Sequence, residues 1–409
     1  PSLRLRPCIE KLMNTSFDVI VIGSGAGGAA VTYPLVQSGA QVLMLERGGR
    51  LPRDGSTLDV DIVLKQGRFK HSETWASATG RRFSPSEFAN VGGKTKWYGA
   101  ALLRFAPEEF LPDADFGMIG FPIRYTELAP FYAEAERLLE VTTFAIEPNL
   151  SALQKGFTAA GWQSEPLPLG LDKRILAHPK EAKHFDGFAS CLDLKSDAQT
   201  KLLARLDNRP NFTLCHNSEV VDLVPDAYDQ RRISGVLTQG GQHYRAKQVV
   251  LAAGALHSPR LLSRYITQQG LSEAFPVAKQ IGRNYKCHLN TALLAISTKI
   301  KTDVLRKTTL FLNTAFPHSS MQTLGWIDGA IIDLEAPAWS PRFLSRGIGR
   351  RAYGFWLTTE DGSHPDNCVR TPLNDSDLPV LDYDPARTPK SVIEHQRLVR
   401  AVRRTLFRM

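Results

Sequence analysis

A glycine-spaced turn near the start of the chain constrains its fold more than any other feature. Residues 17–23 read FDVIVIG, a continuous apolar run typical of a strand buried on both faces. Gly23, Gly25 and Gly28 follow in the spacing GxGxxG, and a helix-like segment then runs to Gly39. Between a strand and a helix, this spacing predicts a tight turn, room for a pyrophosphate against the backbone, and close packing of helix on strand.

A second buried strand, AQVLMLERG, ends in an acid, Glu46, about twenty residues after the turn. A carboxylate at that position accepts hydrogen bonds from ribose hydroxyls and disfavours the 2′-phosphate of NADP. Strand, glycines, helix, strand and acid together predict an adenine dinucleotide site. The residues expected to line it here are Gly23, Ser24, Gly25, Ala26, Gly27, Gly28, Glu46 and Arg47.

The middle of the chain favours FAD over NAD. The segments PNFTLCHNSEVVDLV and ISGVLTQGGQHYRAKQVVLAAGA predict further strands, the last leading through Gly254 into a helix. A dinucleotide fold that resumes so far along the chain is typical of Rossmann-type flavoproteins, whereas an NAD domain is usually contiguous. Val220, Ala253 and Gly254 are therefore expected beside the cofactor. An NAD-linked dehydrogenase is a further alternative, but no second dinucleotide motif supports it.

The segment VGGKTKWYGA, residues 91–100, places bare backbone beside large rings. A helix does not tolerate Gly92, Gly93 and Gly99 so close together, and surface loops rarely carry Trp97 next to Tyr98. The pattern predicts that something flat lies against this backbone.

Composition narrows the class of protein. With 409 residues, 43% of them hydrophobic and 22% charged, the chain predicts a globular protein of two domains, or one large domain with an excursion. The net charge of +9 is scattered apart from a modest arginine cluster near the end. It indicates mainly a solvated surface, with an acidic partner or anionic membrane face as a weaker alternative, and does not favour nucleic acid.

Targeting and metal signals are not evident in the sequence. The five cysteines lack metal-ligand and CxxC spacing, so we expect no metal and reduced thiols in a cytoplasmic protein. No apolar run approaches the ~20 residues that span a bilayer, and the first residues lack the apolar core of a secretion signal. Residues 1–12 show no clear pattern, and Met13 reads like a true beginning, so we expect a non-family N-terminal extension over 1–12.

Several segments, in order, resemble the glucose-methanol-choline (GMC) family of FAD-dependent alcohol oxidoreductases, and more narrowly its bacterial choline-dehydrogenase-like branch. GSGAGG with Glu46 resembles the cofactor motif, NVGGKTKWYGAALLRF the first signature, and GALHSPRLLS the first part of the second. IGRNYKCHLN, DGFASCLDLKSDAQ and GFWLTTEDGSHPDN resemble further stretches of the family or the branch. After Ser263 the chain departs from the second signature with Arg264, Tyr265 and Ile266, where many members have a small residue and glycine.

The resemblance implies an α/β fold of the GMC and p-hydroxybenzoate-hydroxylase type. Its parts would be a Rossmann-type FAD-binding domain with a mostly parallel sheet and an α+β substrate domain with an antiparallel sheet. The expected boundaries are 13–125 with 186–290 for the FAD domain, and 126–185 with 291–409 for the substrate domain. YGFWLTTED would form one strand of the antiparallel sheet, where Trp356 and Glu360 are weak candidates for a quaternary ammonium pocket.

In the family, the double-glycine segment lies along the flavin. The resemblance therefore implies backbone contacts from Gly92 and Gly93, a hydroxyl hydrogen bond from Thr95, and a wall formed by Trp97, Tyr98 and Gly99; ordinary core packing is about as plausible for the two aromatics. Some relatives carry a histidine here that bonds covalently to the flavin. Because Trp97 occupies what looks like that place, non-covalent FAD is expected.

The implied reaction is oxidation of an alcohol CH–OH group, with a base taking the hydroxyl proton and hydride passing to flavin N5. The family's catalytic histidine pair would lie beyond Met409, so the chain is expected to be a fragment lacking it; His257 and His288 are weak substitutes. A catalytically silent FAD-binding protein is the alternative. The electron acceptor would be a quinone, a cytochrome or oxygen, and the alcohol is not specified.

Overall fold

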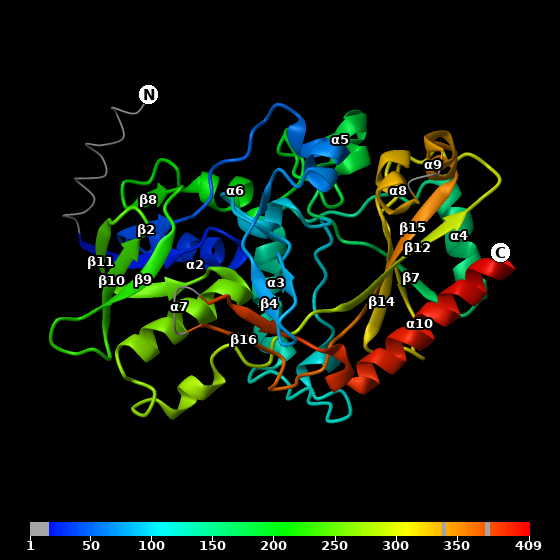
Figure 1. The fold of residues 1–409 in the computed structure, drawn as a ribbon. Helices are drawn as coiled ribbons and strands as arrows, with labels where there is room; N and C mark the ends of the chain where they lie inside the picture. Colours follow the sequence, from blue (N-terminus) through cyan, green and yellow to red (C-terminus); the bar gives the residue numbers. More distant parts are fainter. Residues whose placement is uncertain (1–15, 338–340, 373–376) are drawn as a thin grey trace.

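The computed structural model describes residues 16–337, 341–372 and 377–409 (Figure 1). The expected extension over 1–12 and the expected start at Met13 lie outside these ranges. Two large sheets dominate the fold, one mostly parallel and one antiparallel. The predicted α/β class with both kinds of sheet is therefore confirmed.

The first sheet contains the predicted glycine-turn strands. Its order is β8-β2-β1-β11-β10-β9, with β1 at Ser16–Ile22, β2 at Val42–Leu45, β8 at Phe212–Cys215, β9 at Val220–Pro225, β10 at Ile233–Thr238 and β11 at His243–Leu251. Strands β8, β2, β1 and β11 run parallel, and β10 and β9 continue from β11 as an antiparallel meander. The side chains of β2 are all buried, as a strand covered on both faces requires.

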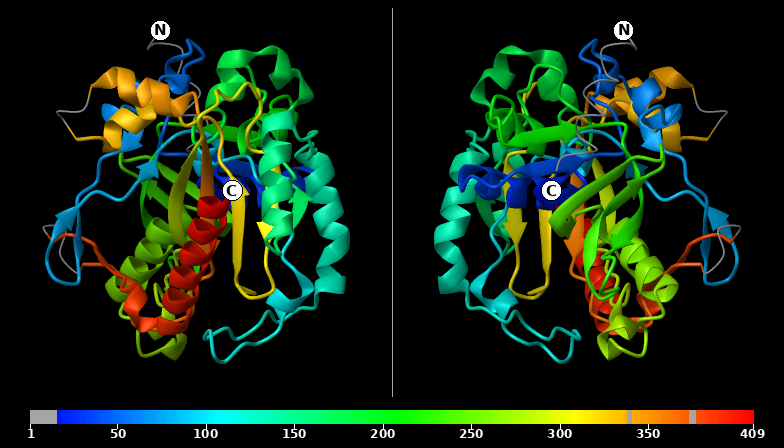
Figure 2. Two further views of the ribbon diagram at one scale, coloured as in Figure 1. Left: turned by 90° about the vertical axis from the view of Figure 1, so that its right-hand side faces the viewer. Right: turned by 90° about the vertical axis from the view of Figure 1, so that its left-hand side faces the viewer.

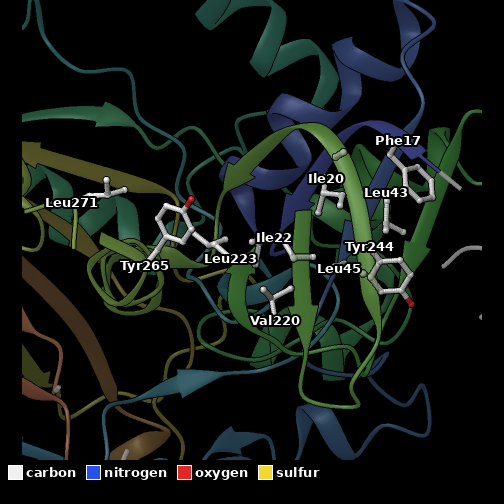
Figure 3. Packing of buried hydrophobic residues seen from close by; sticks show 12 residues of the cluster. Phe17, Ile20, Ile22, Leu43, Leu45, Val220, Leu223, Tyr244, Tyr265 and Leu271 are labelled. Atoms are coloured by element: carbon white, nitrogen blue, oxygen red, sulfur yellow. The ribbon is translucent and has the colours of Figure 1, made fainter. Parts of the chain in front are cut away.

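Two helices follow strands of this sheet directly. Helix α2 (Ala26–Gln37) connects β1 to β2, and α7 (Gly254–Gln268) begins after β11. Two hydrophobic cores cover the two faces of the sheet; one contains Val21, Met44 and Leu203, the other Ile20, Leu43 and Tyr265. Figure 3 shows side chains of the second core. Because both helices begin at strand ends, their N-termini meet at one edge of the sheet.

The second sheet is antiparallel, in the order β12-β15-β14-β13-β7. Its strands are β7 (Gln163–Pro166), β12 (Leu289–Ile296), β13 (Thr309–Leu312), β14 (Ser319–Thr323) and β15 (Ala352–Thr359). Helices α4 (Pro148–Ala159) and α10 (Pro389–Arg408) contribute side chains to the core on one face, where Phe157, Phe355 and Val402 are fully buried. Figures 1 and 2 show α10 lying along the outside of this sheet.

Smaller elements connect the two halves. Strands β4 (Trp75–Ser77), β5 (Arg82–Phe83), β16 (Cys368–Arg370) and β17 (Val380–Asp382) form a four-stranded sheet, and β3 (Lys70–His71) pairs with β6 (Glu87–Phe88). The other α-helices among the described residues are α3 (Tyr125–Leu138), α5 (Pro179–His184), α6 (Ala198–Lys201), α8 (Gly329–Glu335) and α9 (Arg342–Gly349). Val369 packs against Trp75 and Leu256, so the late chain also contacts the early one. The domain boundaries stay a prediction.

Candidate functional site

The glycine turn leaves no room for side chains at two of its three motif positions. Gly23 has φ +100°, and a Cβ there would lie 2.5 Å from the carbonyl oxygen of Ala252 on the neighbouring strand's extension. A Cβ on Gly28 would lie 1.9 Å from the carbonyl oxygen of Gly23, so the helix rests directly on the turn. At Gly25 a Cβ would meet nothing within 4 Å, because this position faces open space. The turn therefore has the three properties that its spacing predicts.

Three sequence motifs are joined by hydrogen bonds around Glu46. The backbone N–H of Gly92 donates to Ser24 Oγ at 3.0 Å, and Ser24 Oγ donates to Glu46 Oε2 at 2.6 Å. The amides of Ser24 and Gly48 also donate to the Glu46 carboxylate, each at 3.0 Å. Ser24 is fully buried, and Glu46 is nearly so. Glu46 thus fixes the glycine turn and the double-glycine loop in one arrangement.

A cavity of about 830 Å³ opens beside this arrangement. This volume lies within the range of small-molecule and cofactor sites. The predicted residues that line it are Gly23, Ser24, Gly25, Ala26, Gly27, Glu46, Arg47, Gly93, Thr95, Val220, Ala253 and Gly254. The fold therefore brings together predicted residues from five separate segments of the chain.

Two helix N-termini face the cavity. Helix α2 starts after Gly25 without a side-chain cap, and α7 starts after Ala253, also without one. Their first residues, Ala26, Gly27, Gly254 and Ala255, all line the cavity. The first amides of a helix lack partners within the helix and carry its positive dipole end, so the edge where the two helices start suits a diphosphate.

Another part of the cavity lining is built from charged side chains. Glu73 Oε1 accepts a hydrogen bond from Arg260 Nη1 at 2.6 Å, and Glu73 Oε2 accepts one from Trp75 Nε1 at 3.0 Å. The Arg260 guanidinium lies over the Trp75 ring, 5.1 Å from its centre. Burial alone would raise the pKa of Glu73, but the hydrogen bond and charge of Arg260 outweigh it and lower that pKa. We call Glu73, His257, Arg260 and Arg264 the α7 wall.

His257 is the histidine among the cavity-lining residues. Its Nε2 is buried without a hydrogen-bond partner among the described residues and lies 3.8 Å from Glu73 Oε2. Burial, followed by the charge of Arg47, lowers the pKa of His257 to about 4. The ring is therefore neutral at pH 7 and a weak base. His288, the other candidate, is exposed and is not part of the cavity lining.

The predicted aromatic wall packs into the protein interior. Trp97 stacks on Phe88 at 4.6 Å between ring centres, and its Nε1 donates to Asn90 Oδ1 at 2.9 Å. Tyr98 Oη donates to the Ser196 carbonyl at 2.7 Å. Neither ring lines the cavity described above, and Gly28 and Gly92 do not line it either. Core packing, the plainer of the two expectations, accounts for both aromatics in this structure.

Gly99, the third glycine of residues 91–100, lacks room for a side chain for a different reason. A Cβ on Gly99 would lie 2.2 Å from Lys307 Nζ and 2.3 Å from Asp186 Oδ1, which form an ion pair of 2.9 Å. Gly99 is therefore kept small by this ion pair and lies outside the cavity lining. Thr95 lines the cavity, but its hydroxyl already donates to the Gly92 carbonyl at 2.5 Å and accepts from Ala198 N at 3.0 Å.

The suggested ammonium pocket on β15 has a competing partner. Glu360 Oε2 and His318 Nδ1 form a hydrogen bond of 2.9 Å, and His318 Nε2 lies 3.1 Å from Asp113 Oδ2. Burial is the largest single influence and opposes protonation of His318, but the hydrogen bonds with Glu360 and Asp113 and the charges of Glu360 and Glu394 together outweigh it and raise the pKa of the ring. Burial and the neighbouring Glu360 raise the pKa of Glu109 to about 7. Glu360 is thus already paired within the protein.

Several cavity residues were not predicted from the sequence. One group lies on α7, where Arg260, Arg264 and Thr267 follow His257 at helical spacing on one face. That spacing was a usable signal once GALHSP was taken as a helix start. A second group comes from distant segments, among them Glu73, Glu219, Tyr285 and Asp377. No local pattern marks those positions.

Taken together, the sheet order, the glycine turn and the paired helix N-termini define a Rossmann-type dinucleotide-binding fold. Residues 89–290 match a family model described as GMC oxidoreductase. Paromamine 6′-oxidase of Streptomyces fradiae is 31% identical over 269 residues, which cover 61% of this chain and 49% of that enzyme. These comparisons support the assignment of the chain to the GMC oxidoreductase family.

Two further comparisons agree. 2-methyl-1,2-propanediol dehydrogenase of Mycolicibacterium austroafricanum is 26% identical over 292 residues, covering 60% of this chain and 50% of that enzyme. The chain therefore spans about half the length of the curated relatives it matches. The crystal structure of pyridoxine 4-oxidase from Mesorbium loti superposes with a TM-score of 0.69 at 17% identity, covering 96% of this chain and 81% of that one. The two chains share a fold.

Proposed function

We propose that the chain binds FAD non-covalently and serves the oxidation of an alcohol CH–OH group. The observation that carries the proposal is the Glu46–Ser24–Gly92 arrangement beside a cavity that receives two helix N-termini. The names of the relatives support the reaction class, because they describe oxidases and dehydrogenases, one of them acting on a diol.

The residues present fit this cofactor. The uncapped starts of α2 and α7 would hold the diphosphate, and Glu46 retains about one lone pair for a ribose hydroxyl beside the three donors that it already accepts. Gly93 presents bare backbone on the same side of the cavity. Trp97 offers no nucleophile for a covalent link, and its indole is held by Asn90. When bound, FAD supplies the acceptor for the substrate's hydride.

The identity of the catalytic base stays open within this proposal. His257 is the histidine that lines the cavity, and with a pKa of about 4 it is too weak a base to take a hydroxyl proton efficiently near pH 7. If His257 were the only base available, the alternative would follow, a catalytically silent FAD-binding protein. A histidine pair beyond Met409, the choline-dehydrogenase-like branch, the electron acceptor and a cytoplasmic location stay predictions.

FAD titration tests the first half of the proposal. Glu46→Ala removes an acceptor for the ribose and two anchors of the turn, so we expect FAD affinity to fall roughly ten- to a hundredfold, the equivalent of a charged hydrogen bond of ~1.5–3 kcal/mol. Glu273→Ala, which removes an exposed acid outside the cavity, is the matched control and should bind like wild type. Equal affinity in both variants, or no FAD binding by wild type, would reject the assignment.

Anaerobic reduction tests the second half. The FAD-loaded protein is mixed with a panel of diols, sugars, choline and simple alcohols, and loss of the oxidised-flavin absorbance is followed. Reduction by any of these supports the alcohol oxidoreductase, and His257→Gln then shows whether His257 takes part. Tight FAD binding with no reduction across the panel supports the silent alternative.

A further inference from the structure

The outer face of helix α10 carries only positive charge. The inner face of the helix buries Leu398 and Val402 against the antiparallel sheet. Its one acid, Glu394, is also buried and accepts hydrogen bonds from Ser319 Oγ at 2.7 Å and His318 N at 3.0 Å. The exposed cations of the helix are Lys390, Arg397, Arg400, Arg403, Arg404 and Arg408. The solvent therefore meets six cations and no acid along this helix.

The protein itself neutralises little of this charge. Lys390 lies 3.7 Å from the exposed Asp115, and Arg397 lies over the Phe316 ring at 5.7 Å. Within the described ranges, Arg403, Arg404 and Arg408 form no ion pair. A patch of one sign with so little internal neutralisation attracts an anionic surface.

Two exposed apolar side chains lie among the cations on the outer face of α10, and we call this row of residues the α10 stripe. Positions 393, 397, 400, 404 and 407 are spaced by three or four residues, so Ile393, Arg397, Arg400, Arg404 and Phe407 lie on one side of the helix. Ile393 is 54% exposed and Phe407 is 93% exposed. Helices that lie in a membrane interface combine basic and apolar groups on the face that meets the lipid.

The helix is also placed where a flat surface can reach it. Figures 1 and 2 show α10 along the outside of the molecule, with the C-terminal half on the surface. Its 20 residues extend about 30 Å, so the stripe presents a long, straight contact. No helix in the described parts of the chain is long and apolar enough to cross a bilayer.

We propose that the outer face of α10 docks on an anionic lipid bilayer. The arginines would contact lipid phosphates, and Ile393 and Phe407 would enter the headgroup region. A nucleic acid or another acidic polymer would also match the cations, and binding measurements with RNA and heparin separate these from the bilayer. This inference does not depend on the proposed function.

Vesicle co-sedimentation of the full chain tests the proposal. We expect binding to vesicles of phosphatidylcholine mixed with phosphatidylglycerol, little binding to phosphatidylcholine alone, and release by salt. Arg400→Gln/Arg404→Gln should weaken binding to the mixed vesicles by about twenty-fivefold, since each basic residue near an anionic surface contributes about fivefold. Phe407→Ser should weaken it severalfold while leaving its salt dependence unchanged.

The control is Arg81→Gln/Arg82→Gln, which removes the same net charge from two exposed arginines outside α10. It should bind like wild type, and circular dichroism should show that all variants are folded. The proposal is overturned if both double variants lose binding equally, or if wild type does not distinguish the two vesicle types. It is also overturned if α10-dependent binding is seen with heparin or RNA and not with the mixed vesicles.

Discussion

Two parts of the cavity lining are built on different principles. The glycine-rich wall consists of the lining residues 23–27, Glu46 and 93–95, with Gly28 and Gly92 directly behind them, and it is fixed by backbone amides and one nearly buried carboxylate. The α7 wall is made of long, charged side chains that balance one another, with Glu73 held by Arg260 and His257 left with an unpartnered Nε2. The first wall is therefore sensitive to added volume, and the second is sensitive to protonation.

The largest effect is expected on the glycine-rich wall. Gly28→Val would place Cβ where it meets the Gly23 carbonyl oxygen, which is backbone and cannot move aside. We expect a loss above the ~1–3 kcal/mol typical of overpacked cores, seen as little soluble protein or a greatly lowered Tm.

The neighbouring glycine provides the control for this change. A Cβ on Gly27 meets nothing within 4 Å, and alanine is the better helix former, so Gly27→Ala should leave the Tm unchanged or slightly raised. A stable, well-folded Gly28→Val protein would show that the turn tolerates volume and that the contrast between the walls is wrong.

An intermediate effect is expected on the α7 wall when the pH is lowered. His257 is buried near Arg47, Arg260, His71 and Glu73, and its pKa falls from 6.5 to about 4. Between these values the unfolded chain binds the proton and the folded one does not, so this group makes stability fall as the pH drops from 6.5 towards 4. The contribution is on the order of 2–3 kcal/mol, and His257→Gln should remove it.

Urea unfolding across that pH window measures the difference between variant and wild type. Other groups titrate there too, so only the difference is informative. His288→Gln, an exposed histidine outside the cavity lining, should follow the wild-type pH dependence. If the His257→Gln curve also runs parallel to wild type, the ring is protonated in the folded protein and the α7 wall does not sense pH through it.

The smallest effect is expected for Trp97, which lies just outside the glycine-rich wall. Trp97→Phe keeps an aromatic ring beside Phe88 but removes the donor to the buried Asn90 Oδ1. We expect a loss of about 1–2 kcal/mol in the free energy of unfolding, with FAD affinity unchanged. An affinity loss of tenfold at unchanged stability would mean that Trp97 contacts the cofactor and that the wall extends further than the structure indicates.

The same contrast explains what could be predicted from the sequence. Gly23, Gly28 and Glu46 lie in a short stretch whose spacing reports local backbone geometry, so both the sheet and this part of the cavity follow from it. Glu73 and Tyr285 reach the cavity only through the tertiary fold, and a single exposed-looking acid or tyrosine carries no local signal. Trp97 and Tyr98 were ambiguous because large rings are equally at home in a core and against a ligand.

The position of β1 in its sheet delays its pairing during protein synthesis. Strand β1 pairs with β11, so Ser16 lies beside Arg245 and Ile22 beside Leu251. During synthesis at about 5–20 residues per second, β11 follows β1 by roughly ten seconds or more. Throughout that interval the nascent chain carries an apolar strand with one edge lacking its final partner. Such an edge is a template for wrong pairing. Because the cavity requires β1 and β11 to be neighbours, the nascent chain needs protection from wrong pairing until β11 has been made.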